Sequence, residues 1–329
     1  MKGFLQGAAN RGPPRARESE GAGRMCPADY RYVPSVFDRP PDLLADVLYV
    51  VGGLYGNFAA LDAVERLAEA EGATVVFNGD FHWFDAEPSW FAEIDRRVAG
   101  HRAIRGNVET ELARAHDVGV GCGCAYPASV AEEVVRRSNE ILLELRRTAQ
   151  TMPGAIERSA ALPMHLVAQV GSLRVGIVHG DATALAGWSF AQEALDAPAA
   201  PALLAAVQRA ARIDVFASTH TCLAALRDFA LGPARLTVIN NGAAGMPNFA
   251  GSRFGLISRI ATTPSPHPPL YGLVRDGVHI DALALPYDSD AFLGRFLTRW
   301  AEDSPAHASY FERITAGPDH TVSRARRAA

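Results

Sequence analysis

The sequence predicts an α/β fold in which two sheets pack face to face and helices cover their outer faces. The early chain alternates strand and helix: an apolar run at 47–51, a helical stripe after Asn57, and a second apolar run at 74–77. This order is typical of a βαβ unit with a parallel sheet. The later chain is richer in strands and starts with a hairpin, since Gly171 and Ser172 join β-rich segments at 165–170 and 173–178.

The remaining elements follow from apolar periodicity and from the turn residues between them. We expect helices near 90–98, 129–149 and 290–301, and strands ending at Arg105 and covering 214–217, 236–239, 256–260, 270–274 and 278–282. Residues 1–28 are expected to be a disordered lead and 317–329 a disordered tail. Residues 29–316 would then form a single domain, with the helix near 129–149 as an insertion.

Composition excludes several classes of protein. Of 329 residues, 48% are hydrophobic and 21% are charged, which excludes a wholly disordered chain, a coiled coil and collagen. The net charge of −4 offers no basic field for nucleic acid or for an anionic membrane. Four cysteines are too few for a disulfide scaffold, and no apolar run is long enough to span a membrane. We therefore expect a cytoplasmic protein, whose oligomeric state the sequence leaves open.

Polar residues gather where five of the predicted strands end. The clusters are Gly52-Gly53-Leu54-Tyr55-Gly56-Asn57, Gly79-Asp80, Gly106-Asn107-Val108-Glu109, His179-Gly180-Asp181 and Thr219-His220-Thr221-Cys222. Strand ends on one edge of an α/β sheet converge on a common crevice. Carboxylate, amide and imidazole groups that meet there form a set that can bind a divalent metal.

The order of these clusters resembles that of the calcineurin-like metallophosphoesterases over roughly residues 46–285. The later segment from Asn240 to Pro247 is also similar to a segment of that family. The resemblance implies a four-layer α/β/β/α sandwich. It also implies a metal site formed by Asp80, Asn107, His179 and His220, with Asn107, His179 and Glu109 as the catalytic group. Glu109 would orient a ligand, and Asn107 would help to hold a phosphate oxygen.

The chain departs from the family at its first metal motif. Gly53 and Tyr55 occupy positions where the family carries Asp and His, Val108 replaces the usual catalytic His, and Cys222 replaces the last His. Mapped onto the family's two metal sites, these changes remove one site and retain the other. We therefore expect one divalent ion (Mn, Zn, Fe or Mg) per chain.

Several residues have two interpretations. His82 could be a substitute metal ligand, but a hydrogen-bond partner in the wall of the site is the favoured interpretation. Cys222 could be a thiolate ligand or a small buried hydrophobe. Tyr55 is expected to fill the vacated metal space, with its hydroxyl bonded to Asp80 or a histidine. Arg105 and Arg253 are candidates for holding phosphate, and the helix near 129–149 could roof the site.

Two functions remain open. The first is a divergent metal-dependent phosphoesterase that hydrolyses a phosphate mono- or diester with a metal-activated water, acting on a small molecule or a phosphoprotein. The second is a catalytically weak or inactive scaffold of the same fold that binds a protein or ligand. A dinucleotide-binding fold is disfavoured because its Gly-rich fingerprint would require glycine at Val51.

Overall fold

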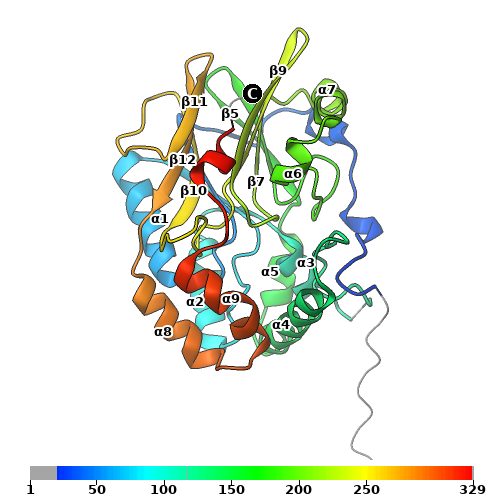
Figure 1. Ribbon diagram of the computed structural model, residues 1–329, viewed down its shortest axis with the longest axis vertical. Helices are drawn as coiled ribbons and strands as arrows, with labels where there is room; N and C mark the ends of the chain where they lie inside the picture. The colour runs from blue at the N-terminus through cyan, green and yellow to red at the C-terminus, as the bar shows by residue number, and fades with distance from the viewer. Residues whose placement is uncertain (1–20, 117, 328–329) are drawn as a thin grey trace, which may run out of the picture.

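The computed structural model describes residues 21–116 and 118–327, and two six-stranded sheets form its centre (Figure 1). In spatial order, the first sheet contains β1 (Leu43–Leu44), β5 (His165–Val170), β6 (Leu173–Val178), β7 (Val215–Ser218), β9 (Ala234–Asn240) and β8 (Ala225–Leu231). The second contains β11 (Tyr271–Arg275), β12 (Val278–Leu285), β10 (Gly255–Ala261), β2 (Val47–Val51), β3 (Thr74–Asn78) and β4 (Arg102–Ile104).

Each sheet contains three neighbouring parallel strands. In the second sheet these are β2, β3 and β4, and in the first they are β6, β7 and β9. The carboxyl ends of the three strands in each group therefore lie at one edge of their sheet. The predicted hairpin is confirmed, since β5 and β6 are antiparallel and Val170 pairs with Leu173.

The alternation of side chains along the strands divides the molecule into four layers. Leu48 and Val50 of β2 belong to the hydrophobic core between the two sheets, together with Val175 of β6. Tyr49 and its alternate neighbours face the other way and pack with α1 (Phe58–Glu71). On the far side, α7 (Ala200–Ala211) packs with the outer residues of the first sheet, near the short helix α6 (Gln192–Leu195) (Figure 1). The predicted α/β/β/α sandwich is thereby confirmed.

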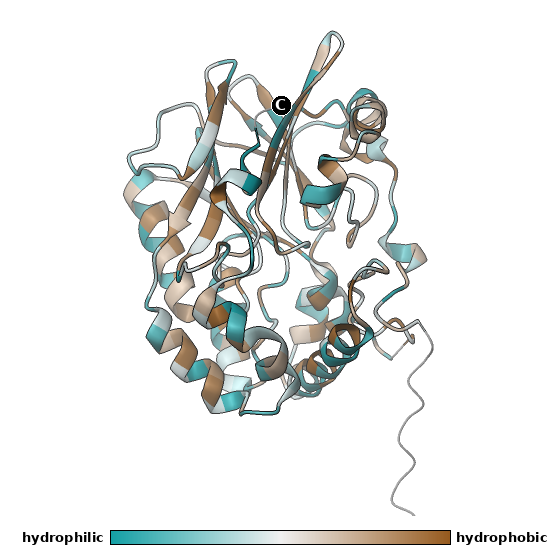
Figure 2. Cartoon of the chain, viewed as in Figure 1, coloured by the Kyte–Doolittle hydropathy of each residue, from teal (hydrophilic) through white to brown (hydrophobic). Residues whose placement is uncertain are grey.

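Local sequence accounts for the helix that follows β2. The Asn57 side chain accepts a hydrogen bond from the Ala60 N–H at 3.0 Å, which caps the start of α1. The helix ends at Gly72, whose φ of 65° is a left-handed conformation that glycine adopts without strain. Figure 2 shows hydrophobic residues along the strands and both hydrophobic and hydrophilic residues along the outer helices, as expected for buried sheets covered by amphipathic helices.

A group of helices lies in the lower half of the view in Figure 1 and packs as a second hydrophobic unit. The group consists of α2 (Pro88–Val98), α3 (Asn107–Leu112), α4 (Glu132–Gln150), α5 (Ala155–Ala161), α8 (Ser289–Arg299) and α9 (Pro305–Ala316). Helix α4 is the one expected near 129–149. It packs chiefly on α9 rather than on a sheet, so the two helices together cover the end of the molecule.

The ends of the chain differ from the expectation where the structure describes them. Residues 1–20 and 328–329 lie outside the described residues, but 317–327 form an ordered segment with a short helix, α10 (Val322–Ala325). Arg227 on β8 donates to the carbonyls of Arg324 and Ala325, and the buried His320 stacks on Phe249. The predicted disordered tail is therefore wrong over 317–327, because these residues satisfy a buried arginine.

The predicted lead also ends earlier than expected. Arg24 donates hydrogen bonds to the carbonyls of Pro127 and Val130, and a 3-10 turn at Ala28–Tyr30 buries the Tyr30 ring. A second 3-10 turn at Pro34–Phe37 follows. Among the described residues, no helix has the length and apolar character needed to cross a membrane.

Candidate metal centre

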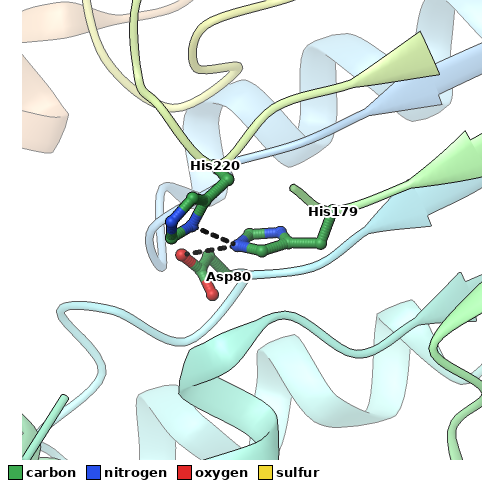
Figure 3. A group of neighbouring side chains, drawn as sticks. All are labelled: Asp80, His179 and His220. Atoms are coloured by element: carbon green, nitrogen blue, oxygen red, sulfur yellow. Dashed lines mark hydrogen bonds and ion pairs between the residues drawn. The ribbon is translucent and has the colours of Figure 1, made fainter. Parts of the chain in front are cut away.

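Four polar side chains meet where parallel strands of both sheets end. Asp80 follows β3 and Asn107 follows β4 in the second sheet, whereas His179 follows β6 and His220 follows β7 in the first. Figure 3 shows Asp80, His179 and His220 pointing toward one another across the gap between these strand ends. All four side chains are buried, with Asp80 the most exposed at 7%. The structure thus brings together the four residues expected to bind a metal.

The Nε2 atom of His179 is the centre of this group. It lies 3.3 Å from Oδ2 of Asp80, 3.1 Å from Oδ1 of Asn107 and 3.1 Å from Nδ1 of His220. The possible ligand atoms of Asp80, His179 and His220 all lie within 4.8 Å of one another. These three buried residues could therefore hold a metal ion, and the Asn107 oxygen is close enough to be a fourth ligand.

Neighbouring backbone groups determine which atoms face the centre. His179 Nδ1 lies 2.8 Å from the Asn78 carbonyl, and His220 Nε2 lies 3.1 Å from the Cys124 carbonyl. A carbonyl can only accept, so each of these nitrogens carries a proton, and the opposite ring nitrogen is left to face the centre. The Asn107 Nδ2 group donates to the Cys122 carbonyl, which turns its oxygen inward.

The result is a cluster of acceptors with a shortage of donors. In the neutral tautomers, two imidazole lone pairs, an amide oxygen and a carboxylate oxygen face one another at hydrogen-bond distance. Such an arrangement is repulsive unless a proton or a metal cation lies within it. Two nitrogen ligands with one anionic and one neutral oxygen ligand suit Zn²⁺, Fe²⁺ or Mn²⁺, so the donor set fits the expected ion.

The ionisation of the group is consistent with a cation site. Burial opposes ionisation of Asp80, but His179 holds the pKa of that carboxyl below its usual range. Burial also acts against the charged form of His179, yet the Asp80 carboxylate raises the pKa of this imidazole above its ordinary value. Burial and then the charge of His179 lower the pKa of His220 to about 4.

Glu109 supports the centre without facing it. Its Oε2 atom accepts the N–H of Asp80 at 2.8 Å and that of Gly106 at 2.9 Å, and Oε1 accepts the N–H of Phe81 at 3.0 Å. The carboxylate thus joins the end of β3 to the end of β4. Since Asp80 and Asn107 follow those two strands, these contacts suit a residue that positions both ligands.

His82 does not join the group. Its Nδ1 lies 3.0 Å from Oδ2 of Asp85, and its ring stacks on Phe91 at a centroid distance of 3.8 Å. The position of His82 is thus that of a hydrogen-bond partner in the wall, the second of the two interpretations open from the sequence.

Tyr55 and Cys222, which stand where the resemblance leads us to expect metal ligands, both line the pocket and contact each other. The Tyr55 hydroxyl lies 2.9 Å from the Cys222 sulfur, so its partner is the thiol and not Asp80 or a histidine as expected. An ideal Cβ on Gly53 would lie 2.8 Å from Cζ of Tyr55, so the tyrosine ring fills the space that a side chain at this position would use. Burial raises the pKa of both the Cys222 thiol and the Tyr55 phenol.

Backbone strain is concentrated at this site. Tyr55, Asp80, His220 and Cys222 have φ values of 54°, 54°, 20° and 58°, a region that L-residues with side chains rarely adopt. Such strain costs about 1–3 kcal/mol per residue and persists where the surrounding structure enforces it, often at functional sites. The close approach of the strand ends also accounts for the glycines beside the ligands, since an added Cβ on Gly106 would lie 2.3 Å from Oδ1 of Asp80.

A pocket of about 140 Å³ opens beside the cluster. Besides cluster residues and the Tyr55–Cys222 pair, its lining includes Trp83, Cys124, Tyr126, Trp188, Tyr310 and Arg313. Tyr310 and Arg313 come from α9, and no local sequence pattern predicts this, since nothing in the sequence brings residue 313 next to residue 222. Helix α4, expected to roof the site, contributes no lining residue.

The two arginines expected to hold phosphate lie elsewhere. Arg105 donates to the Ala160 carbonyl, and Arg253 forms an ion pair with Asp290 at the surface. Neither lines the pocket. The cationic residue of the pocket is Arg313, so this part of the sequence interpretation was wrong.

The structure is similar to solved structures at low sequence identity. A hypothetical protein from Pyrococcus horikoshii OT3 matches with a TM-score of 0.55 and 17% identity, over 84% of this chain and 100% of that chain. A metallophosphoesterase from Sphaerobacter thermophilus matches with a TM-score of 0.52 and 14% identity, over 83% of this chain and 100% of that chain. No family model matches the sequence, and no curated protein matches it significantly.

Proposed function

Because the chain has the metallophosphoesterase fold, we propose that it is a phosphoesterase that hydrolyses a phosphate mono- or diester with one divalent metal ion. The ion would be held by Asp80, Asn107, His179 and His220. The observation that carries this proposal is the buried group of acceptor atoms around His179 Nε2, which a divalent metal ion would satisfy in place of a proton on His179.

One ion, not two, fits the residues that line the pocket. A second dication needs anionic or imidazole ligands, but Gly53 has no side chain and the Tyr55 phenol and Cys222 thiol are kept neutral by burial. The Tyr55 ring also occupies the space beside Gly53. Gly53, Tyr55 and Cys222 therefore offer no anionic or imidazole ligand for a second ion.

Each residue has a defined task in the proposed reaction. The metal, when bound, supplies the Lewis acidity that polarises a phosphoryl oxygen and lowers the pKa of a water. Asp80 would compensate the positive charge of the ion, and the backbone contacts of His179 Nδ1 and His220 Nε2 would leave the other nitrogen of each ring free to bind it. Asn107 directs its oxygen into the pocket because its amide donates to Cys122. Glu109 fixes the positions of Asp80 and Asn107 relative to each other.

The size of the pocket favours a small-molecule substrate. Its volume of about 140 Å³ is close to that of a cavity that accommodates benzene. Aromatic rings of Tyr126, Trp188 and Tyr310 form part of the lining and suit a planar organic group attached to the phosphate.

A metal-dependent activity screen tests the proposal. Purified protein is supplied with Mn²⁺, Zn²⁺, Fe²⁺ or Mg²⁺ and assayed with aryl phosphate monoesters and diesters, with metal content measured by elemental analysis. We expect hydrolysis that depends on one metal equivalent and is lost in Asp80→Asn, whereas the exposed control His267→Ala retains it. A protein that binds no metal, or binds it without hydrolysing any ester, would instead support the scaffold function.

A further inference from the structure

The pocket beside the candidate metal centre is lined by an arginine that forms no ion pair with a carboxylate among the described residues. Arg313, on α9, is the one arginine or lysine among the described residues that line the pocket. Its Nη2 group donates to the Cys222 carbonyl at 2.6 Å, and its Nε is buried without a hydrogen-bond partner. Within the described part of the chain, no carboxylate lies within ion-pair distance of it. A guanidinium has five N–H donors, so most of its donors are unused by the protein.

Arg313 lies close to two residues that stand where the family carries metal ligands. Its positive charge acts on both Tyr55 and Cys222, which replace two of those ligands, and it hydrogen-bonds to the backbone of the latter. Asp80 and His220 line the same pocket. The positive charge of Arg313 therefore lies beside the two residues that stand where the family carries ligands of its second metal ion.

We propose that Arg313 binds the phosphoryl group of the substrate and supplies from α9 the second positive charge of the site, beside the metal held by Asp80, Asn107, His179 and His220. The proposal rests on the proposed function for the identity of the metal-holding residues. The planar guanidinium can form two parallel hydrogen bonds to phosphate oxygens. A metal ion binds oxygens without this paired hydrogen-bond geometry. The ester's organic group would then contact the aromatic residues of the lining.

The competing explanation is that Arg313 only stabilises the turn that contains Cys222. Cys222 has a φ of 58° and is two residues from His220, so a loosened turn would also displace a metal ligand. The two explanations therefore differ in one measurable way. A structural role affects metal affinity together with phosphate affinity, whereas phosphate binding by Arg313 affects phosphate affinity alone.

Titration calorimetry with Mn²⁺ and then with inorganic phosphate separates these roles. The variants are Arg313→Gln, Arg313→Lys and the control Arg235→Gln, whose arginine forms an exposed ion pair with Asp228. We expect Arg313→Gln to weaken phosphate binding by about tenfold to a hundredfold, as for loss of hydrogen bonds to a charged group, with Mn²⁺ affinity unchanged. Arg313→Lys keeps the charge but loses the paired geometry, so it should lie between wild type and Arg313→Gln.

Each result has a definite consequence. Equal phosphate affinity in wild type and Arg313→Gln, or no phosphate binding by the wild type, overturns the proposal. A parallel loss of Mn²⁺ affinity and phosphate affinity also overturns it and assigns Arg313 to the turn. If phosphate binding depends on Arg313 but no ester is hydrolysed, the proposal stands and the phosphoesterase function fails.

Discussion

His179 Nε2 and His220 Nδ1 lie 3.1 Å apart, and the other nitrogen of each ring lies against a backbone carbonyl. Two imidazoles in these tautomers cannot both be neutral without directing their lone pairs at each other. In the metal-free protein, a proton on His179 relieves this contact, in agreement with the raised pKa of His179 and with the pKa of about 4 for His220. A metal ion and this proton therefore compete for the same place.

Metal binding should release one proton. Since the pKa of His179 is raised and that of His220 is lowered, His179 is the group that must lose its proton when metal enters. Below the pKa of His179, apparent metal affinity should fall about tenfold for each unit by which pH decreases. Calorimetry of Zn²⁺ binding between about pH 6 and 8, in buffers of different ionisation enthalpy, measures both effects. An affinity that stays constant over this range, with no proton release, would contradict the competition.

His220 and Cys222 should differ sharply in their effect on metal binding. His220→Ala removes a ligand atom from the cluster and should lower metal affinity about tenfold or more. Cys222→Ser should change affinity little, because the Cys222 sulfur contacts the Tyr55 hydroxyl and the His220 carbonyl rather than the centre. His267→Ala provides an exposed control. A large loss of bound metal in Cys222→Ser alone would make the thiol a ligand and reverse this assignment.

Loss of the Glu109 carboxylate should affect both stability and metal affinity. In Glu109→Gln, an NH₂ group faces at least one of the three N–H donors that the carboxylate accepts, which should cost about 1–3 kcal/mol of unfolding free energy. The displaced ends of β3 and β4 should also lower metal affinity about tenfold or more. Denaturant unfolding and metal titration measure these effects, with the exposed Glu312→Gln as control. A destabilised variant with unchanged metal affinity would show that Glu109 supports the fold but does not position the metal ligands.

Much of the site could be predicted because its residues directly follow strands. Asp80, Asn107, His179 and His220 each come at the end of a parallel strand, and such ends share an edge. A strand is visible in the sequence as an apolar run, so both its end and the polar residue after it can be located. The four-layer sandwich followed from the same alternation of strands and helices.

The other half of the pocket could not be predicted in this way. Arg313 and Tyr310 reach it from a helix that lies well beyond the last strand in the chain, and only tertiary packing against Trp83 and Cys222 brings them there. The ordered segment at 317–327 was missed for the same reason, since its short polar sequence is held by Arg227 on a distant strand. Contacts of this kind leave no periodic pattern in the sequence.

Replacing Gly53 should depend on Tyr55. An added side chain at Gly53 collides with the Tyr55 ring, with Cβ only 2.8 Å from Cζ, and Gly53 has a φ of 63°. Gly53→Asp alone should therefore destabilise the protein by about 1–3 kcal/mol through overpacking and backbone strain. Tyr55→His removes the phenol end of the ring, so the double variant should be more stable than the two single effects predict. Strictly additive losses in unfolding free energy would contradict the contact between positions 53 and 55.

The same double variant tests whether one metal site was lost from this chain. Gly53→Asp with Tyr55→His supplies a carboxylate and an imidazole next to Asp80, and the added negative charge favours a second dication. We expect a second, weaker metal site that Cys222→His strengthens, measured by calorimetry and by anomalous scattering at saturating Mn²⁺ or Zn²⁺. Gly53→Ala with Tyr55→His is the matched control, since it clears the same space without the carboxylate and should bind one ion. If the double variant with the added carboxylate folds normally and still binds a single ion, Gly53 and Tyr55 do not occupy former ligand positions, and the explanation for a single-metal site loses its basis.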